Sequence, residues 1–309
     1  MKLSIVSTLY NSEKYISQFL EQVNEAAKKF FDEFEIILVN DGSPDESLKV
    51  SLDFLDVYKN IRVIDLSRNF GHHKAMMTGL MQCQGDFVFL IDSDLEEDPC
   101  WLGSFYEVLE STRCDVVYGV QEKRKGGFLE RHTGNLFYFI LNLLTSIKIP
   151  QNLVTARLMT RRYVNALIKH TEREVFIAGL WEITGFVQLP KIVKKKSGSE
   201  TTYTIKRKFS LLVNSVTSFS NIPLVTIFYS GISILVFSVL YITYLSINWM
   251  FFSNPMSGWT SLIASVWLLG GLIISFIGIT GIYISKIFSE VKQRPYTIIK
   301  EIYEYQKHS

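Results

Sequence analysis

Cysteine, net charge and an apolar leader are all scarce or absent in this sequence. Three cysteines occur in 309 residues, and Cys83, Cys100 and Cys114 have neither zinc-site spacing nor a pairing pattern, which suits a reducing compartment. The net charge of +2 argues against a nucleic-acid binder driven by phosphate contacts. The apolar stretch after Met1 is too short for a signal peptide, so we expect residues 1–208 to stay in the cytosol.

Charged residues are also missing from two long runs in the last third of the chain. The runs cover 223–252 and 259–287 and contain no Asp, Glu, Lys or Arg before Lys286. A membrane-spanning helix needs about 20 apolar residues, so each run predicts a transmembrane helix. Basic residues flank the outer ends of the pair. The positive-inside rule therefore predicts that both ends face the cytosol and that the turn at 253–258 faces the other side.

Basic residues gather in two other segments. The segment 191–208 is rich in lysine and precedes the first apolar run, and such a segment is attracted to anionic lipid. We interpret most of these lysines as a membrane-facing surface without a catalytic role. The basic loop 123–127 follows an expected strand, so a solvated role and an anion-binding role are both open. The stretch 128–149 reads as a helix with a wide apolar face, either core or membrane interface.

The first part of the chain alternates between strand and helix patterns. Apolar runs predict strands at 3–8, 35–39, 61–66, 87–91 and 115–120, with helical patterns between most of them. This alternation predicts an α/β fold, with a mostly parallel sheet covered by helices on both faces. Ligands of such sheets bind outside the carboxyl ends of the strands, so the loops that follow the strands are the candidate site.

Carboxylates follow the fourth expected strand. Asp92 and Asp94 are two residues apart, so they point to the same side if the strand continues past its end. They need a counter-charge, and a divalent cation shared with a diphosphate would supply one. The alternative is an acidic loop that caps the next helix. Asp98 before Pro99 has that character, whereas Asp92 and Asp94 do not stand where a cap needs them.

Other polar residues follow the neighbouring strands. Asp41 is placed to accept a hydrogen bond from a base or ribose, and Arg68 is placed to meet a phosphate or to form a structural ion pair. His72 and His73 are adjacent and face different ways in a helix, so we expect a polar surface role and no shared metal. Arg157 and Arg161 share one face if their stretch is helical.

Seven motifs in a fixed order support a family resemblance. They are 4–6 with 10–13, 39–43, 67–71, 92–95, 115–119, 157–162 and 217–220, and two apolar runs follow them. The chain resembles the family-2-type nucleotide-sugar glycosyltransferases, and among them the polyprenyl-phosphate group of dolichol-phosphate mannose synthases and bactoprenol glucosyl transferases. The resemblance covers nearly the whole chain.

The resemblance implies a fold, a layout and a reaction. It implies a GT-A-type cytosolic domain at 1–208, a juxtamembrane amphipathic segment at 209–222, a transmembrane hairpin at 223–287 and a cytosolic tail at 288–309. The expected enzyme is a multi-pass protein of the cell inner (plasma) membrane. It moves a hexose from a nucleotide sugar onto undecaprenyl or a related polyprenyl phosphate, with inversion. The donor is left open between UDP-glucose, UDP-GlcNAc and GDP-mannose, and the two C-terminal spans favour a UDP-hexose.

The resemblance also implies roles for individual residues. The expected nucleotide-sugar-binding residues are Tyr10, Glu13, Asp41, Arg68 and Asp92. The expected Mg²⁺ or Mn²⁺ ligands are Asp92, Asp94 and Glu96, with Asp92 and Asp94 as the catalytic pair. The expected acceptor-phosphate residues are Arg124, Arg157 and Arg161.

The chain departs from the family pattern in three places. Thr8 replaces a usual Pro and Ser12 a usual Glu, which puts the base pocket in question. The residues before Arg157 include no acidic side chain, so we assign no general base. A lipid phosphate is already ionised at neutral pH and needs none.

Two other functions and one assembly question stay open. A polymerising glycosyltransferase would carry a Gln-x-x-Arg-Trp motif and more spans, and neither is present. A non-enzymatic scaffold that kept the fold would not bind a nucleotide sugar with a metal. Small residues in the second run permit close helix approach within one chain or in a homo-oligomer: Gly270, Gly271, Gly278 and Gly281.

Overall fold

The computed structural model describes residues 1–121, 150, 152–172, 176–196, 213, 216–217, 220–252 and 258–305. The chain divides into two compact units. The first comprises Met1–Phe139, Ile147–Ile205 and Arg294–Ser309, and the second comprises Ile140–Ser146 and Lys206–Gln293. Our interpretations of 123–127, of 128–149 and of the lysines beyond residue 196 lie outside the described residues, as does Arg124.

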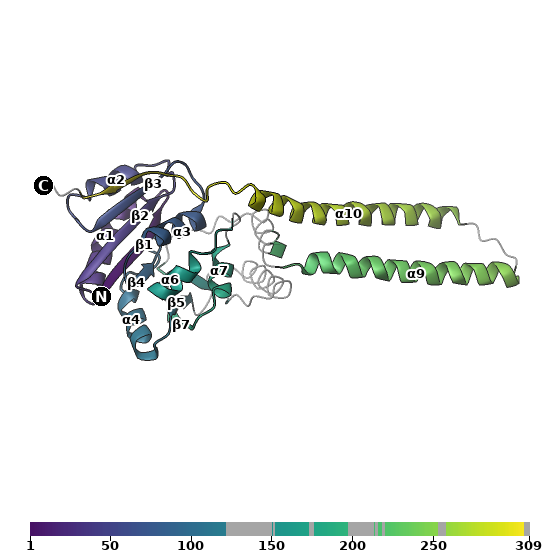
Figure 1. Ribbon diagram of the computed structural model, residues 1–309, viewed down its shortest axis with the longest axis horizontal. Helices are drawn as coiled ribbons and strands as arrows, with labels where there is room; N and C mark the ends of the chain where they lie inside the picture. Colours follow the sequence, from purple (N-terminus) through teal and green to yellow (C-terminus); the bar gives the residue numbers. More distant parts are fainter. Residues whose placement is uncertain are drawn as a thin grey trace. The chain divides into compact units, whose positions relative to one another are not determined.

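An eight-stranded sheet with the order β7-β5-β6-β4-β1-β2-β3-β8 forms the first unit (Figure 1). The strands β1 to β4 are parallel, and β6 and β8 run against their neighbours. The sheet is therefore mostly parallel, as the alternating pattern predicts. The strands are β1 Lys2–Leu9, β2 Glu33–Asn40, β3 Ile61–Leu66, β4 Phe87–Leu90, β5 Val116–Gln121, β6 Leu153–Thr160, β7 Gln188–Val193 and β8 Ile299–Glu304.

Helices cover the sheet because their apolar residues recur on one side. In α1, buried residues stand three or four apart, including Ile16, Phe19, Leu20 and Val23. The central strands β1 and β2 are buried almost throughout, as parallel strands with helices on both faces must be. The helices of this unit are α1 Glu13–Lys28, α2 Ser47–Asp53, α3 His72–Gln82, α4 Trp101–Thr112, α6 Arg161–Leu167 and α7 Ile177–Ile183.

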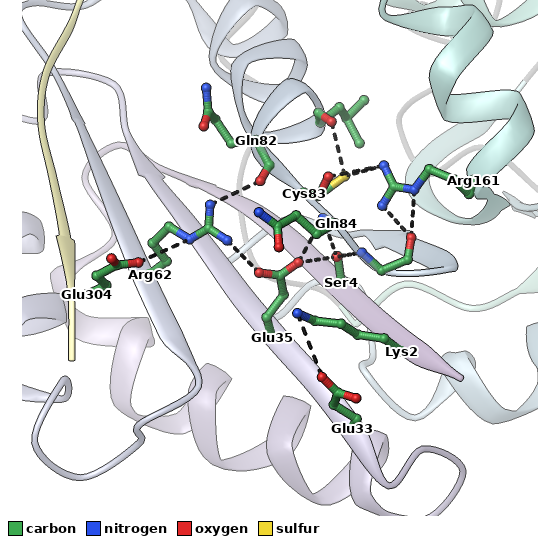
Figure 2. A network of polar contacts seen from close by, with 12 residues as sticks. Lys2, Ser4, Glu33, Glu35, Arg62, Gln82, Cys83, Gln84, Arg161 and Glu304 are labelled. Atoms are coloured by element: carbon green, nitrogen blue, oxygen red, sulfur yellow. Dashed lines mark hydrogen bonds and ion pairs between the residues drawn. The ribbon is translucent and has the colours of Figure 1, made fainter. Parts of the chain in front are cut away.

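A buried polar network closes the edge of the sheet where the parallel strands begin (Figure 2). Glu35 accepts hydrogen bonds from Ser4 Oγ at 2.6 Å and from the Gln84 N–H at 2.9 Å, and Arg62 Nη2 lies 2.7 Å from Glu35 Oε2. Burial alone would raise the pKa of Glu35, but these partners bring it below its ordinary value. The network therefore holds an ionised carboxylate.

Arg161 also belongs to this edge. Its guanidinium donates to the carbonyl oxygens of Gly85 and Cys83, just before β4 begins. Arg157 lies in β6 and pairs with Leu90 at the other end of β4, so the expectation of one shared helical face is wrong. The reason is that β6 runs antiparallel to β4, which carries the two arginines to opposite edges of the sheet.

Strand β8 was not expected from the sequence. It follows the last long helix, belongs to the first unit and pairs antiparallel with β3; in Figure 1 it is the yellow segment beside the strand labelled β3. Lys300 Nζ lies 3.2 Å from the buried carboxylate of Asp65, and the Ser67 N–H donates to the Ile298 carbonyl at 2.9 Å. The stretch 299–304 is thus part of the sheet.

Two long apolar helices form most of the described second unit. They are α9 Ile222–Phe252 and α10 Trp259–Val291, which confirms that the two apolar runs are helical. Each contains a segment long and apolar enough to cross a membrane, Ile222–Tyr241 and Ser265–Val291. The Tyr283 hydroxyl donates to the Ser220 carbonyl at 2.6 Å, which ties the start of α9 to α10.

Candidate active site

The candidate site lies where the parallel strands end. The loops after β1, β2, β3 and β4 meet at this edge because those strands run in one direction. Strand β7 has the same direction, since it is parallel to β5 and β5 and β4 both run against β6. The residues after β7 therefore reach the same edge, as does the beginning of β6.

Asp92 leaves β4 into a polar chain of contacts. Its Oδ1 lies 3.3 Å from His72 Nε2, and His72 Nδ1 lies 2.9 Å from Thr8 Oγ1. Burial alone would raise the pKa of Asp92, but His72 and the nearby Lys195 lower it, so this carboxylate is ionised. His72 therefore has the polar role expected of it, and the structure adds its partner, because the ring contacts Asp92.

Asp94 stands close to Asp92 and carries unbalanced charge. Its Oδ1 accepts the Glu96 N–H at 3.0 Å, in a turn that Leu95 makes with a φ of 61°. Burial and the neighbouring Asp92 raise the pKa of Asp94. Burial and neighbouring carboxylates thus outweigh the effect of Lys195 on the pKa of Asp94, and a divalent ion bound here would favour the ionised form.

Glu97 is fully buried beneath these residues. It accepts the Thr155 N–H at 2.9 Å, and Lys195 Nζ lies 3.3 Å from the same oxygen, Oε1. Burial and the charge of Asp92 raise the pKa of Glu97 to about 7. Glu97 thus joins β4, β6 and the segment after β7, a role that sequence reasoning missed although Glu97 directly follows the acidic motif.

Lys195 and Lys196 belong to this site. Lys195 Nζ also lies 3.5 Å from Glu96 Oε2, and Lys196 Nζ lies 2.9 Å from Asp98 Oδ2. The membrane-facing interpretation, which was made for most of the lysines in 191–208, does not describe the contacts of these two residues. The available signal was position, because they follow a strand of the same sheet.

The acidic cluster fits a hard divalent cation. Carboxylate oxygens are the donors that Mg²⁺ and Mn²⁺ prefer, and Mg²⁺ often takes one or two of them together with substrate phosphates. Within the described residues no three His, Cys, Asp or Glu side chains converge as a ready-made metal site. Glu96 is paired with Lys195, so Asp92 and Asp94 are the ligands best placed to share a cation with a diphosphate.

Asp41 joins the loops after β2 and β3. Its carboxylate accepts the N–H of Phe70 at 2.7 Å and of Gly71 at 3.0 Å, and its burial raises its pKa. Gly42 has a φ of 57°, and a Cβ there would lie 2.4 Å from the Asn69 nitrogen. The two loops are therefore packed together, and Arg68 extends from them with its guanidinium 4.1 Å from the centre of the Phe70 ring.

Glu13 and Tyr10 stand beside these loops. Glu13 Oε2 accepts the Glu46 N–H at 2.9 Å, while the Glu13 N–H donates to Asp45 at 3.1 Å. Hydrogen bonds from Ser43 and Ser47 lower the pKa of Asp45 to about 2, against the effect of burial. The Tyr10 side chain is half exposed and is open to a planar ligand. The residues expected to bind the base thus lie close together. The Glu13 carboxylate, however, accepts a hydrogen bond that links the start of α1 to the start of α2.

Arg157 lies under the acidic cluster in an aromatic pocket. Its guanidinium lies over the Trp181 ring and within 5.9 Å of the Tyr118 ring centre. Burial lowers its pKa to about 9, and Nη2 has no hydrogen-bond partner. A buried donor without an acceptor favours an anionic ligand. Arg161 is not brought to this edge, and Trp181 was not singled out from the sequence.

These residues form a site rich in carboxylates and basic side chains at the edge of an α/β sheet. Residues 4–168 match the family model described as glycosyl transferase family 2. The chain belongs to this family, and family membership brings with it the GT-A fold and a glycosyltransferase activity.

Relatives match along nearly the whole chain. A protein of Mycobacterium tuberculosis named "Putative glycosyltransferases" is 52% identical over 98% of this chain and 89% of its own. The SfII prophage-derived bactoprenol glucosyl transferase of Shigella flexneri is 32% identical over 97% of this chain and 98% of its own. Among solved structures, S. aureus TarS with UDP-GlcNAc has a TM-score of 0.46 and 20% identity, and the match covers 71% of this chain and 66% of that one.

Proposed function

We propose that the protein transfers a hexose from a UDP-sugar to undecaprenyl phosphate or a related polyprenyl phosphate, inverting the anomeric carbon. The observation that carries this proposal is the end-to-end similarity to a bactoprenol glucosyl transferase, in a chain whose candidate site is acidic and whose apolar helices could enter a membrane. Bactoprenol is a polyprenol, so a polyprenyl-phosphate acceptor fits both the similarity to this relative and the apolar helices.

The donor would bind across the loops after β1 to β4. Tyr10, Glu13, Asp41 and Arg68 border the space for the nucleotide, and Asp92 and Asp94 border the space for the diphosphate. Mg²⁺ or Mn²⁺ held by the two aspartates would neutralise the charge that builds on the leaving nucleoside diphosphate. The role of the two carboxylates is to hold the positive charge of the ion beside the leaving diphosphate.

The acceptor needs positioning more than activation. A lipid phosphate is ionised at neutral pH, so its oxygen attacks the anomeric carbon directly while the bond from that carbon to the diphosphate oxygen breaks. Arg157 supplies a buried cation with a free Nη2 donor on the same edge as Asp92. Arg124 remains an expected partner of the same phosphate, and Arg161 is left out because it binds the Gly85 carbonyl.

The same proposal gives the membrane arrangement. The helices α9 and α10 would cross the inner membrane as a hairpin, with the glycosyltransferase domain and both termini in the cytosol. The small residues of α10 face open space in the single chain, which leaves room for packing in a homo-oligomer.

A lipid-transfer assay tests the proposal. Purified protein in detergent receives undecaprenyl phosphate, Mg²⁺ or Mn²⁺ and a panel of labelled nucleotide sugars, and label in the lipid phase is scored. We expect label from one donor that is lost with EDTA and in Asp94→Asn. No lipid label from any donor, with folded protein, would contradict the proposal. Label that survives in Asp94→Asn would place the metal elsewhere.

A further inference from the structure

Lys195 reaches into the acidic cluster from outside the donor-binding motifs. Its ammonium lies 3.3 Å from Glu97 Oε1 and 3.5 Å from Glu96 Oε2, and its side chain is 19% exposed. Glu97 is fully buried and already accepts a backbone N–H, so it is held in place for this contact. The lysine is therefore part of the site.

The backbone around Lys195 is also fixed. The Lys196 N–H donates to the Glu96 carbonyl at 2.9 Å, and Lys196 Nζ pairs with Asp98 at 2.9 Å. Just before it, Val193 is buried at the end of β7, which pairs with β5. Two anchors, one on each side, keep Lys195 close to the acidic motif, so its charge acts on the motif continuously.

That charge has opposite effects on the two ligands of the site. The charge of Lys195 acts on both Asp92 and Asp94, so a divalent cation held by these carboxylates is repelled by the ammonium. The diphosphate of a donor is attracted by it. Once the diphosphate is present, the divalent cation and the Lys195 ammonium can both pair with its negative charge. They then no longer compete for the carboxylates.

Building on the metal site of the proposed function, we propose that Lys195 is a resident counter-cation that suppresses divalent-ion binding until the donor's diphosphate arrives. The ion and the donor then bind as one unit. By linkage, the lysine strengthens the effect of each ligand on the affinity of the other. Lys195 acts here as a positioning residue, through the electrostatics of the ligand site.

Binding measurements on the full chain in detergent test this inference. Mn²⁺ affinity is measured by electron paramagnetic resonance with no nucleotide, with UDP and with GDP. We expect Lys195→Met to bind Mn²⁺ roughly tenfold more tightly than wild type without nucleotide, and to gain less from adding nucleotide. Lys195→Arg keeps the charge and should behave as wild type. Lys194→Met is the matched control, since Lys194 is exposed in the same segment.

The outcomes separate the two proposals. Unchanged or weaker Mn²⁺ binding in Lys195→Met, with normal coupling to nucleotide, overturns the role of Lys195 and leaves the proposed function intact. An equal effect in Lys194→Met also overturns it, because the cause would then be net charge. If Asp94→Asn binds Mn²⁺ as wild type does, the metal lies elsewhere and the role of Lys195 falls with it, whereas the proposed function is still decided by the lipid-transfer assay.

Discussion

Removing the Glu35 carboxylate should destabilise the glycosyltransferase domain without touching the candidate site. Glu35 and Arg62 are 10% and 16% exposed, and Glu35→Ala leaves the guanidinium and the Gln84 N–H without their shared acceptor. Breaking a largely buried ion pair of this kind costs about 3–5 kcal/mol. A domain of this size loses roughly 2–4 °C in Tm per kcal/mol, so we expect a fall of roughly 6–20 °C.

The assay is thermal unfolding of the full chain in detergent, followed by circular dichroism. Glu33→Ala is the matched control, because Glu33 forms a 3.9 Å ion pair with Lys2 but is 73% exposed, and such surface pairs contribute little. If both variants melt together near the wild-type temperature, the network does not stabilise the fold and the reasoning is refuted.

The pH dependence of the same network has a defined sign. Because the folded pKa of Glu35 lies below the ordinary value of 4.5, its contribution is present above that pH. It is lost as the pH falls through the folded value. The difference in Tm between wild type and Glu35→Ala should therefore shrink on acidification. A difference that grows toward low pH would contradict an ionised Glu35.

Three further predictions concern the candidate site. Arg157→Lys should lower lipid labelling by roughly a hundredfold at fixed donor, because a lysine cannot reproduce the planar contact with Trp181, and labelling close to wild type would count against an acceptor role. Gly42→Ala should weaken UDP binding roughly tenfold in calorimetry, since the added Cβ meets backbone at 2.4 Å. Burial alone would lower the pKa of His72, but Asp92 raises it above its ordinary value. The stability that His72 contributes is therefore complete at low pH and is lost as the pH rises through its folded pKa. His72→Gln should abolish that dependence in melts at pH 5–9, and an unchanged profile would exclude the contact.

The sequence predicted the parallel part of the sheet because that part is encoded locally. Strands β1 to β5 are apolar runs bounded by turn formers, and burial on both faces makes such runs easy to identify. The positions of Asp92 and Asp94 could be predicted from these strands, because residues that directly follow a parallel strand lie at the carboxyl edge of the sheet. The position of Asp41 could be predicted in the same way, because it comes directly after another strand of the parallel sheet.

The rest depends on partners that no local pattern reveals. Strand β7 is only partly buried and has no long apolar run, so 188–196 reads as a basic surface until its pairing with β5 places Lys195 beside Glu97. Arg157 and Arg161 lie at opposite edges of the sheet because β6 is a strand that runs antiparallel to β4. Their spacing of four residues in the sequence does not reveal this strand. Half of the residues of β8 are charged, and the segment forms a strand because β3 offers Arg62 and Asp65 as partners for Glu304 and Lys300.

The place of β8 in the chain sets an order of assembly. The ribosome makes this strand only after both long apolar helices, so β3 remains an open edge throughout their synthesis. An open edge can pair with other chains, and Asp65 stays without Lys300 during that time, although Asn40 Nδ2 donates to it at 2.7 Å. Closing the sheet therefore reports that the apolar hairpin has been completed, and a chain that stalls within the hairpin keeps an exposed edge for quality-control factors to find.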